Sequence, residues 1–330
     1  MTSAVLFALF LAAPQQTPSA PAAPTLAHAE TLAGKGQMDK ALAELDALAT
    51  ASPEPAGVER LRGFIFYREN KFAEAQAAYA KALAQDPKDV DSMQMQGVTY
   101  FRMGKPAEAI PLLEKAHASV PSANVDPNYV LGLCYMDTRR YDDARHAFAA
   151  QYGFAPDSAP AYLLAARLFL RREYLPASEE SARKALALEP RLPLAHQLLG
   201  EVALAKADFP GAIAELEKER EINPLDGALY DRLGDAYIRN GQYDDARAAL
   251  NRAVLLEPNS TGPYILLGKV LLKQQNATMA AMYLQRALHM DPSNYITHTL
   301  LGQAYRAAGR NAEAAQEFQT AEKIQAETSH

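Results

Sequence analysis

The chain has 330 residues, and its 39 acidic and 33 basic side chains leave a formal net charge of −6. This mild acidity argues against the concentrated basic face that binds nucleic-acid phosphates, so a helical-repeat RNA binder is only a distant alternative. Alanine and leucine are abundant and β-branched residues are few, which predicts an all-helical protein.

The first 24 residues differ in composition from the rest. Residues 4–13 are almost purely apolar, and residues 14–24 are rich in proline and alanine and carry no charge. Ten apolar residues are too few to cross a bilayer but suit the core of a secretory signal, although no Lys or Arg precedes them. We interpret residues 1–24 as a signal peptide and linker. We expect an exported protein, periplasmic or secreted, with no integral membrane span in its mature form.

The alternative for this segment is a disordered apolar tail on a cytoplasmic protein. The cleavage site is left open, because small residues with suitable spacing occur only near Ala20 and Ala22, far from the apolar core. The true start codon is left open as well.

From residue 25 onward a two-helix pattern repeats, most clearly in residues 227–260. In this stretch Tyr230, Leu233, Gly234 and Tyr237 recur with the spacing of one helix face. An Asn-Gly turn follows, then a second apolar stripe, and the stretch closes at a Glu-Pro pair where a helix cannot continue. The pattern predicts two antiparallel helices that bury their stripes against each other and against neighbouring pairs.

The landmarks of this pattern recur at intervals of 34 residues, with one interval of 35. Each repeat has a small residue at its eighth place, which lets the second helix approach closely. An aromatic residue three places later, an alanine early in the second helix and a closing proline complete the pattern in most repeats. The small residues are Gly63, Gly97, Gly132, Ala166, Gly200, Gly234, Gly268 and Gly302, and the prolines are Pro53, Pro87, Pro121, Pro156, Pro190, Pro224, Pro258 and Pro292.

These landmarks resemble those of the tetratricopeptide repeat, whose period and Leu-Gly, Tyr, Ala and Pro positions they follow. The resemblance implies an all-α solenoid over residues 25–328, a right-handed superhelix of antiparallel helix pairs in nine tandem units. The unit boundaries fall near 22–55, 56–89, 90–123, 125–158, 159–192, 193–226, 227–260, 261–294 and 295–328.

Three parts of the array depart from the pattern. Unit five has Ser178 and Ala182 where an alanine and a bulky residue are expected, and unit six has Ala203 for the aromatic residue and Glu219 for an alanine. We expect the weakest packing near these two units and at unit one, whose match is poor. The last helix is expected to cap the array, with Gln316, Gln319, Glu322 and Lys323 facing outward.

The sequence shows little sign of catalytic chemistry. It has no glycine-rich phosphate loop, and the repeats leave no room for a separate catalytic domain. Its seven histidines form no pair with a carboxylate at helical spacing, so we expect no metal site, and Cys134 is interpreted as a small buried hydrophobe. We therefore predict a protein that is not an enzyme and uses no cofactor.

Two function classes remain. By resemblance, the array is a protein-binding scaffold whose groove is lined by places two, five, nine and twelve of each first helix. The alternative is a structural array that assembles complexes through its ends or outer face. The partner is a protein or peptide rather than nucleic acid, and its identity, its pathway and the oligomeric state of the chain are left open.

The predicted groove residues are apolar in units two to four and charged beyond them. An apolar side chain at a wet position favours a binding patch, although the twelfth-place side chains have packing against the next helix as an alternative. The apolar set is Phe64, Tyr67, Val98, Phe101, Tyr129, Leu133 and Met136, and the charged set is Arg167, Arg171, Glu201, Asp231 and Asp235.

Overall fold

The computed structural model describes residues 23–119 and 128–328, which form eighteen α-helices and no strand within these ranges. The all-helical prediction is confirmed. The predicted signal segment up to residue 22 lies outside the described residues, as does the segment 121–127, which carries the extra residue of the one 35-residue interval.

The helices fall into two compact units that divide after residue 127. The N-terminal unit contains α1 (Leu26–Gly34), α2 (Met38–Leu48), α3 (Val58–Arg68), α4 (Phe72–Gln85), α5 (Val90–Arg102) and α6 (Pro106–Ser119). The C-terminal unit contains α7 (Asn128–Asp137), α8 (Tyr141–Tyr152), α9 (Ala159–Arg171), α10 (Leu175–Leu188), α11 (Ala195–Ala205), α12 (Phe209–Ile222), α13 (Gly227–Arg239), α14 (Tyr243–Leu256), α15 (Thr261–Lys273), α16 (Ala277–Met290), α17 (Tyr295–Ala307) and α18 (Asn311–Thr328).

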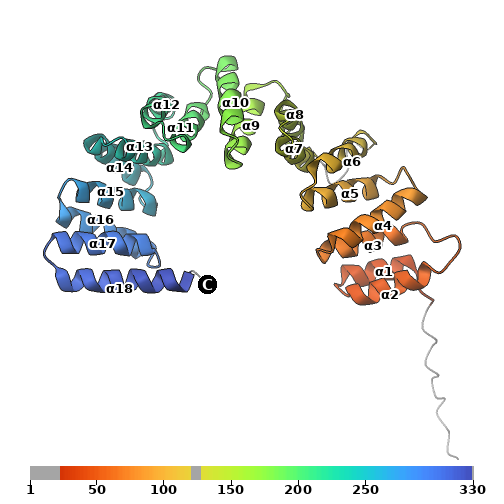
Figure 1. Ribbon diagram of the computed structural model, residues 1–330. Coiled ribbons are helices and arrows are strands. Elements are labelled where there is room, and N and C mark those ends of the chain that lie inside the picture. The colour runs from red at the N-terminus through yellow and green to blue at the C-terminus, as the bar shows by residue number, and fades with distance from the viewer. Residues whose placement is uncertain (1–22, 120–127, 329–330) are drawn as a thin grey trace, which may run out of the picture. The chain divides into compact units, whose positions relative to one another are not determined.

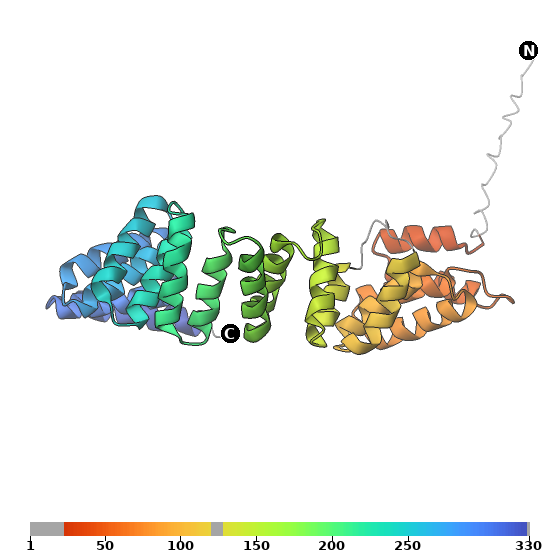
Figure 2. The same cartoon turned by 90° about the horizontal axis from the view of Figure 1, so that it is seen from above.

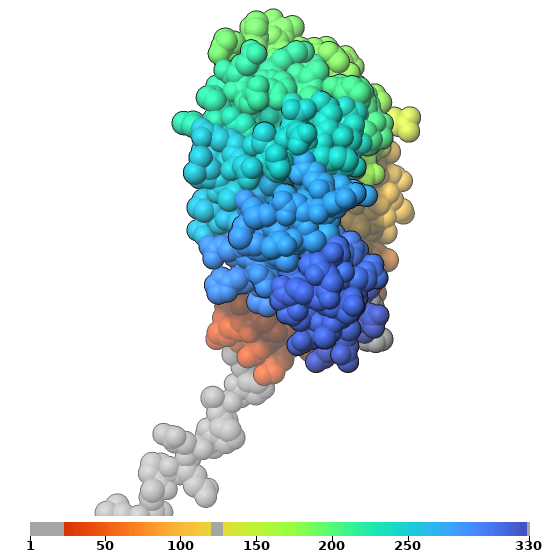
Figure 3. Space-filling view, turned by 90° about the vertical axis from the view of Figure 1, so that its left-hand side faces the viewer, coloured from red at the N-terminus to blue at the C-terminus, as the bar shows by residue number. Residues whose placement is uncertain are grey.

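Each repeat is one odd-numbered helix packed on the even-numbered helix that follows it, and the pairs stack in chain order within each unit (Figures 1 and 2). In the space-filling view, the layers of the C-terminal unit succeed one another from green to blue and end at α18 (Figure 3). Most successive odd-numbered helices of a unit also touch, as α3 touches α5 and α13 touches α15, although α7 and α9 do not to this extent. Successive even-numbered helices make no comparable contact. The odd-numbered helices therefore line the tighter, inner side of each stack, which we call the odd-helix face.

One close contact holds the two helices of a repeat together. The glycine at the eighth place of the odd-numbered helix lies against a large side chain of the even-numbered helix, and a Cβ atom added to the glycine would lie within 2.7 Å of that side chain. Real Cβ atoms do not approach so closely, so a larger residue at these positions would force the facing side chain to shift. The pairs are Gly63 with Tyr79, Gly97 with Leu113, Gly132 with Phe148, Gly200 with Leu216, Gly234 with Leu250, Gly268 with Leu284, and Gly302 with Phe318.

The fifth repeat makes the same contact with the sizes exchanged. Ala166 stands in place of the glycine, Ala182 stands in place of the large residue, and both side chains are fully buried. Ser178, also fully buried, donates a hydrogen bond of 2.8 Å from its hydroxyl to the carbonyl of Ala166. Within this repeat the expectation of loose packing is wrong, because a smaller α10 side chain leaves room for the methyl group on α9. Between repeats it holds, since repeat five packs less extensively on its neighbours than the later repeats pack on one another.

The sixth repeat uses its unexpected residue, Glu219, to begin a helix. Leu194, with φ 70°, precedes α11 and offers no side chain that could cap it. The fully buried carboxylate of Glu219 on α12 accepts hydrogen bonds from the backbone N–H groups of Leu194, at 2.7 Å, and Gln197, at 3.3 Å. These are unpaired donors at a helix N-terminus, where negative charge is favoured. Glu219, at a place where most repeats have an alanine, therefore caps the N-terminus of α11.

The two ends of the array follow the expectations. In repeat one, α2 packs less extensively on α3 than other even-numbered helices pack on the helix that follows them in their unit. At the other end, Gln316, Gln319, Glu322 and Lys323 of α18 are exposed, while Ala314 and Ala321 face the preceding helices and are buried. The last helix therefore presents a polar outer side.

We predict that the glycine contact is energetically coupled to its partner. Gly234→Ala should destabilise the chain by about 1–3 kcal/mol, because the added methyl overlaps Leu250. Leu250→Ala alone should cost about 2–5 kcal/mol. The double variant should cost less than the sum by at least about 1 kcal/mol, because it recreates the Ala166–Ala182 arrangement. Urea denaturation measures all three changes in the free energy of unfolding.

Gly34→Ala is the matched control for this cycle. A Cβ atom at Gly34, also in a helix, meets no atom within 4 Å. This variant should gain up to about 1 kcal/mol from the better helix propensity of alanine. Strict additivity of the two substitutions at positions 234 and 250 would contradict the size-matching account.

Candidate partner-binding surface

In the N-terminal unit, the predicted apolar side chains lie on α3 and α5, on the odd-helix face. Phe64 is 38% exposed, and Val98, Tyr67 and Phe101 are half-buried. The Tyr67 ring packs on Phe72 with ring centroids 5.8 Å apart, so part of its surface is already used inside the fold. Phe64 is therefore the most accessible apolar group of this set.

In the C-terminal unit, the first predicted side chains lie on α7. Tyr129 is 38% exposed and its ring lies 5.9 Å from that of Phe148, whereas Leu133 is half-buried. Met136 is fully buried, so it packs in the core, as its alternative interpretation held. The structure thus groups Phe64, Tyr67, Val98 and Phe101 in one unit, and Tyr129, Leu133 and Met136 in the other.

The predicted charged residues lie on three successive odd-numbered helices, and only some of them are free to meet a partner. Glu201 on α11 forms an ion pair of 2.5 Å with Arg232, and Asp235 on α13 forms one of 2.8 Å with Arg239. Arg167 and Arg171 on α9 are exposed and have no hydrogen-bond or ion-pair partner among the described residues. The free positive charge of this surface is therefore concentrated on α9.

Asp231 is the exception among the acidic residues. Burial raises the pKa of its carboxyl group, and the negative charges of Asp235 and Glu257 act in the same direction against the lowering effect of Arg232. Its Oδ1 atom is buried without a hydrogen-bond partner among the described residues. A carboxylate held in this setting costs free energy, and sites that bind or react often retain such groups.

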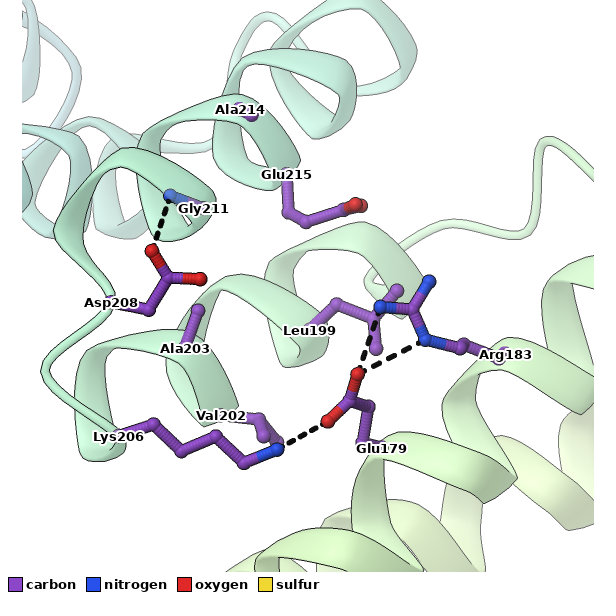
Figure 4. Close-up of a pocket in the computed structure, with 10 residues that line it drawn as sticks. All are labelled: Glu179, Arg183, Leu199, Val202, Ala203, Lys206, Asp208, Gly211, Ala214 and Glu215. Atoms are coloured by element: carbon purple, nitrogen blue, oxygen red, sulfur yellow. Dashed lines mark hydrogen bonds and ion pairs between the residues drawn. The ribbon is translucent and has the colours of Figure 1, made fainter.

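A cavity of about 180 Å³ lies between α10, α11 and α12, and its charged groups are already paired (Figure 4). Glu179 accepts hydrogen bonds from Arg183, at 2.8 and 3.1 Å, and forms an ion pair with Lys206. These two donors lower the pKa of Glu179. Asp208 accepts from the backbone N–H of Gly211 at 3.0 Å. We interpret this cluster as a link between repeats five and six.

The sequence analysis missed three histidine–glutamate pairs that join the two helices of a repeat. They are His28 with Glu44, at 2.5 Å, His196 with Glu215, at 2.7 Å, and His298 with Glu317, at 2.6 Å. The search for pairs at i+3 and i+4 could not find them, because the turn between the helices separates the partners by 16 or 19 residues.

The single cysteine is buried, as the sequence interpretation held. Cys134 is fully buried, and burial raises the pKa of its thiol to about 12, which disfavours the reactive thiolate. Within residues 23–119 and 128–328, no three His, Cys, Asp or Glu side chains are grouped closely enough to hold a metal ion. In the same ranges, no helix combines the length and the apolar character that crossing a membrane requires.

Sequence profiles of two related families match the chain. The profile of the C-terminal domain of cilia and flagella-associated protein 70, a tetratricopeptide domain, matches residues 87–293. A tetratricopeptide repeat profile matches residues 26–90 and 265–327. None of the curated proteins compared with the sequence matches it.

Solved structures resemble parts of the chain. MamA 41-end from Desulfovibrio magneticus RS-1 is 20% identical, with a TM-score of 0.50 over 53% of this chain and 98% of its own. YrrB, described as a tetratricopeptide protein with an unusual peptide-binding site, is 23% identical, with a TM-score of 0.49 over 55% of this chain and 93% of its own. At these identities the likeness concerns the fold alone.

We predict that Asp231 lowers stability at neutral pH. The raised pKa means that the folded state favours the protonated carboxyl group, so the penalty is absent below the ordinary pKa of aspartate, near 4, and grows as the pH rises through the raised value. Asp231→Asn should therefore be more stable than the wild type at pH 7, and the difference should shrink toward pH 4. Thermal unfolding across this pH range measures it.

Asp235→Asn is the control, because its carboxylate is paired with Arg239 on the surface. This variant should lose up to about 1 kcal/mol at pH 7 with its ion pair, and the relief of its repulsion with Asp231 should offset only part of this loss. A destabilised Asp231→Asn variant, or a difference from wild type that does not vary with pH, would mean that the Asp231 carboxylate has a stabilising partner.

Proposed function

Because the chain belongs to the tetratricopeptide repeat family, we propose that it is a non-catalytic scaffold that binds a partner protein along the odd-helix face of its units. This fold is typical of protein–protein interaction modules. The observation that carries the proposal is the exposure of two aromatic side chains on this face, Phe64 and Tyr129, each 38% exposed although Tyr129 also packs on Phe148.

Exposed aromatic rings suit the role of anchors. A large, rigid side chain offers much contact area and loses little conformational freedom when it is covered. Phe64 supplies such an anchor in the N-terminal unit, and Tyr129, with Leu133 beside it on α7, supplies one in the C-terminal unit. A segment bound to either unit therefore carries an apolar side chain for the aromatic anchor of that unit.

The charged side chains of the odd-helix face that have no partner help to orient the bound segment. Arg167 and Arg171 lie one helical turn apart on α9 and have no partner among the described residues, so they favour a carboxylate of the bound segment. Glu201 and Asp235 contribute less, because each would first have to leave its own arginine. Charges of this kind set register and association rate more than affinity.

A structural array is the second candidate, and the even-numbered helices supply its support. Leu188 on α10 is 57% exposed, Leu255 on α14 is 69% exposed and Met282 on α16 is 50% exposed. Apolar groups on this outer side suit assembly with other components. Export from the cytoplasm also stays a proposal, which rests on the apolar run in residues 4–13.

Paired substitutions distinguish the two candidates. We predict that Phe64→Glu together with Leu133→Glu lowers partner capture by at least about tenfold, because each places a charge at an apolar contact. Helix content and melting temperature should stay near those of the wild type. Capture is measured on proteins that co-purify from the native host and are identified by mass spectrometry.

The matched control carries the same charges on the outer side, as Leu188→Glu with Leu255→Glu. It should capture the same proteins as the wild type. If the outer pair loses capture while the folded inner pair keeps it, the structural-array function replaces the scaffold function.

A further inference from the structure

A cavity of about 190 Å³ opens on the odd-helix face of the N-terminal unit. Its walls are mostly apolar, formed by Leu61 and Phe64 of α3, Met95 of α5 and Tyr79 of α4. Its remaining lining comes from Gly57 and from three charged residues, which are Glu30, Arg60 and Asp91. All these groups belong to one compact unit, so the cavity does not depend on the position of the other unit.

Tyr79 lines this cavity although it belongs to α4, an even-numbered helix. It is the only α4 residue in the lining, and its ring passes over Gly63 of α3, where an added Cβ would meet Cδ1, Cε1 and Cζ of the ring. The hydroxyl is the end of the ring farthest from α4, and the side chain takes part in the lining of the cavity. The side chain is fully buried, and its hydroxyl has no hydrogen-bond partner among the described residues.

Helix packing does not require this hydroxyl. The corresponding contacts over Gly132 and Gly302 are made by Phe148 and Phe318, and the remaining repeats use leucine or alanine at this place. Tyr79 alone adds a polar atom there. A buried hydroxyl without a partner lowers stability, and a phenylalanine would avoid this cost.

The charged residues at the cavity carry an excess of negative charge. Arg60 donates a hydrogen bond of 3.3 Å to Asp89, the N-cap of α5, and lies 3.6 Å from Asp91. Asp91 is largely exposed, and Glu30 has no ion-pair or hydrogen-bond partner among the described residues. The lining thus holds two carboxylates and one guanidinium, which Asp89 outside the lining already engages, and this balance favours a cationic occupant.

We propose that this cavity receives an arginine side chain of the bound protein segment. The guanidinium group donates to the Tyr79 hydroxyl and to the carboxylates of Glu30 and Asp91, and its aliphatic stem packs on Leu61 and Phe64. The proposal rests on the proposed scaffold function and gives one anchor of the bound segment its chemistry.

Arginine fits these groups better than lysine for physical reasons. Its planar fork presents five N–H donors in several directions, so it can reach acceptors on different helices, and it is less strongly hydrated than an ammonium group. Phe64 offers apolar contact to the aliphatic stem, because its ring already has the Arg68 guanidinium 5.8 Å from its centroid. Met95 is the most adaptable wall of the cavity, and a rotation of its side chain gives a ligand access to the hydroxyl.

The test uses the full chain with ¹³C-methyl methionine and observes the Met95 methyl resonance. The probes are the blocked amino acids N-acetyl-arginine methylamide, N-acetyl-lysine methylamide and N-acetyl-leucine methylamide. The arginine probe should shift the Met95 resonance saturably and bind more tightly than the other two, while Met282 on α16 should not respond. Tyr79→Phe, and separately Glu30→Gln with Asp91→Asn, should each weaken binding of the arginine probe by about tenfold.

The melting temperature of free Tyr79→Phe supplies a second readout, and it should equal or exceed that of the wild type. Equal binding of leucine and arginine probes, no response of Met95 to the arginine probe, unchanged binding in the variants, or a lower melting temperature of Tyr79→Phe would each overturn the proposal. Because no partner protein is used, these outcomes are separate from a failure of partner capture.

Discussion

The close approach of the two helices in each repeat is the constraint on which the rest of the structure depends. A glycine on the odd-numbered helix admits a large side chain from the even-numbered helix, as Gly234 admits Leu250. This contact sets the distance between the helices and therefore the spacing of the repeats along the stack. It also leaves an adjacent side of the odd-numbered helix, where Phe64 and Tyr129 are exposed, free of the even-numbered helix of the same repeat. The same packing that stabilises the array thus presents the surface proposed for a partner.

Much of the fold could be predicted because its signal is local and repeated. Spacing of apolar residues identifies a helix face, proline and glycine mark the breaks, and the recurrence of both every 34 residues gives the helix pairs. The unusual residues of the fifth and sixth repeats were interpreted as losses of packing, because the residues that compensate for them lie on a neighbouring helix. From α10 alone, Ala182 predicts a loss of packing, but Ala166 on α9 fills the space. From α12 alone, Glu219 is a buried charge without a purpose, but it accepts hydrogen bonds at the start of α11. A pattern read one helix at a time does not contain these pairings.

The sequence predicts which candidate residues share a helix face, but it does not predict the contacts that these residues make. The period of a helix places Asp231 and Asp235 on one face, one turn apart, yet only the fold pairs Asp235 with Arg239 and leaves the Asp231 carboxylate partly buried. Met136 likewise shares its place in the repeat with Tyr67 but is fully buried. The cavity near Tyr79 was not predicted, because its lining comes from four helices of three repeats. Its sequence signal is a single tyrosine at a place that elsewhere holds an apolar side chain.

Site-specific photocrosslinking in the native host tests the central claim most directly, which is that the odd-helix face holds the partner. A benzophenone amino acid replaces the half-buried Val98 on α5 in one variant, Leu133 on α7 in a second, and the exposed Leu255 on α14 in a third. The account predicts that the first two variants crosslink to the same partner protein and that the third does not. Crosslinking from position 255 alone, in chains that fold normally, would contradict it.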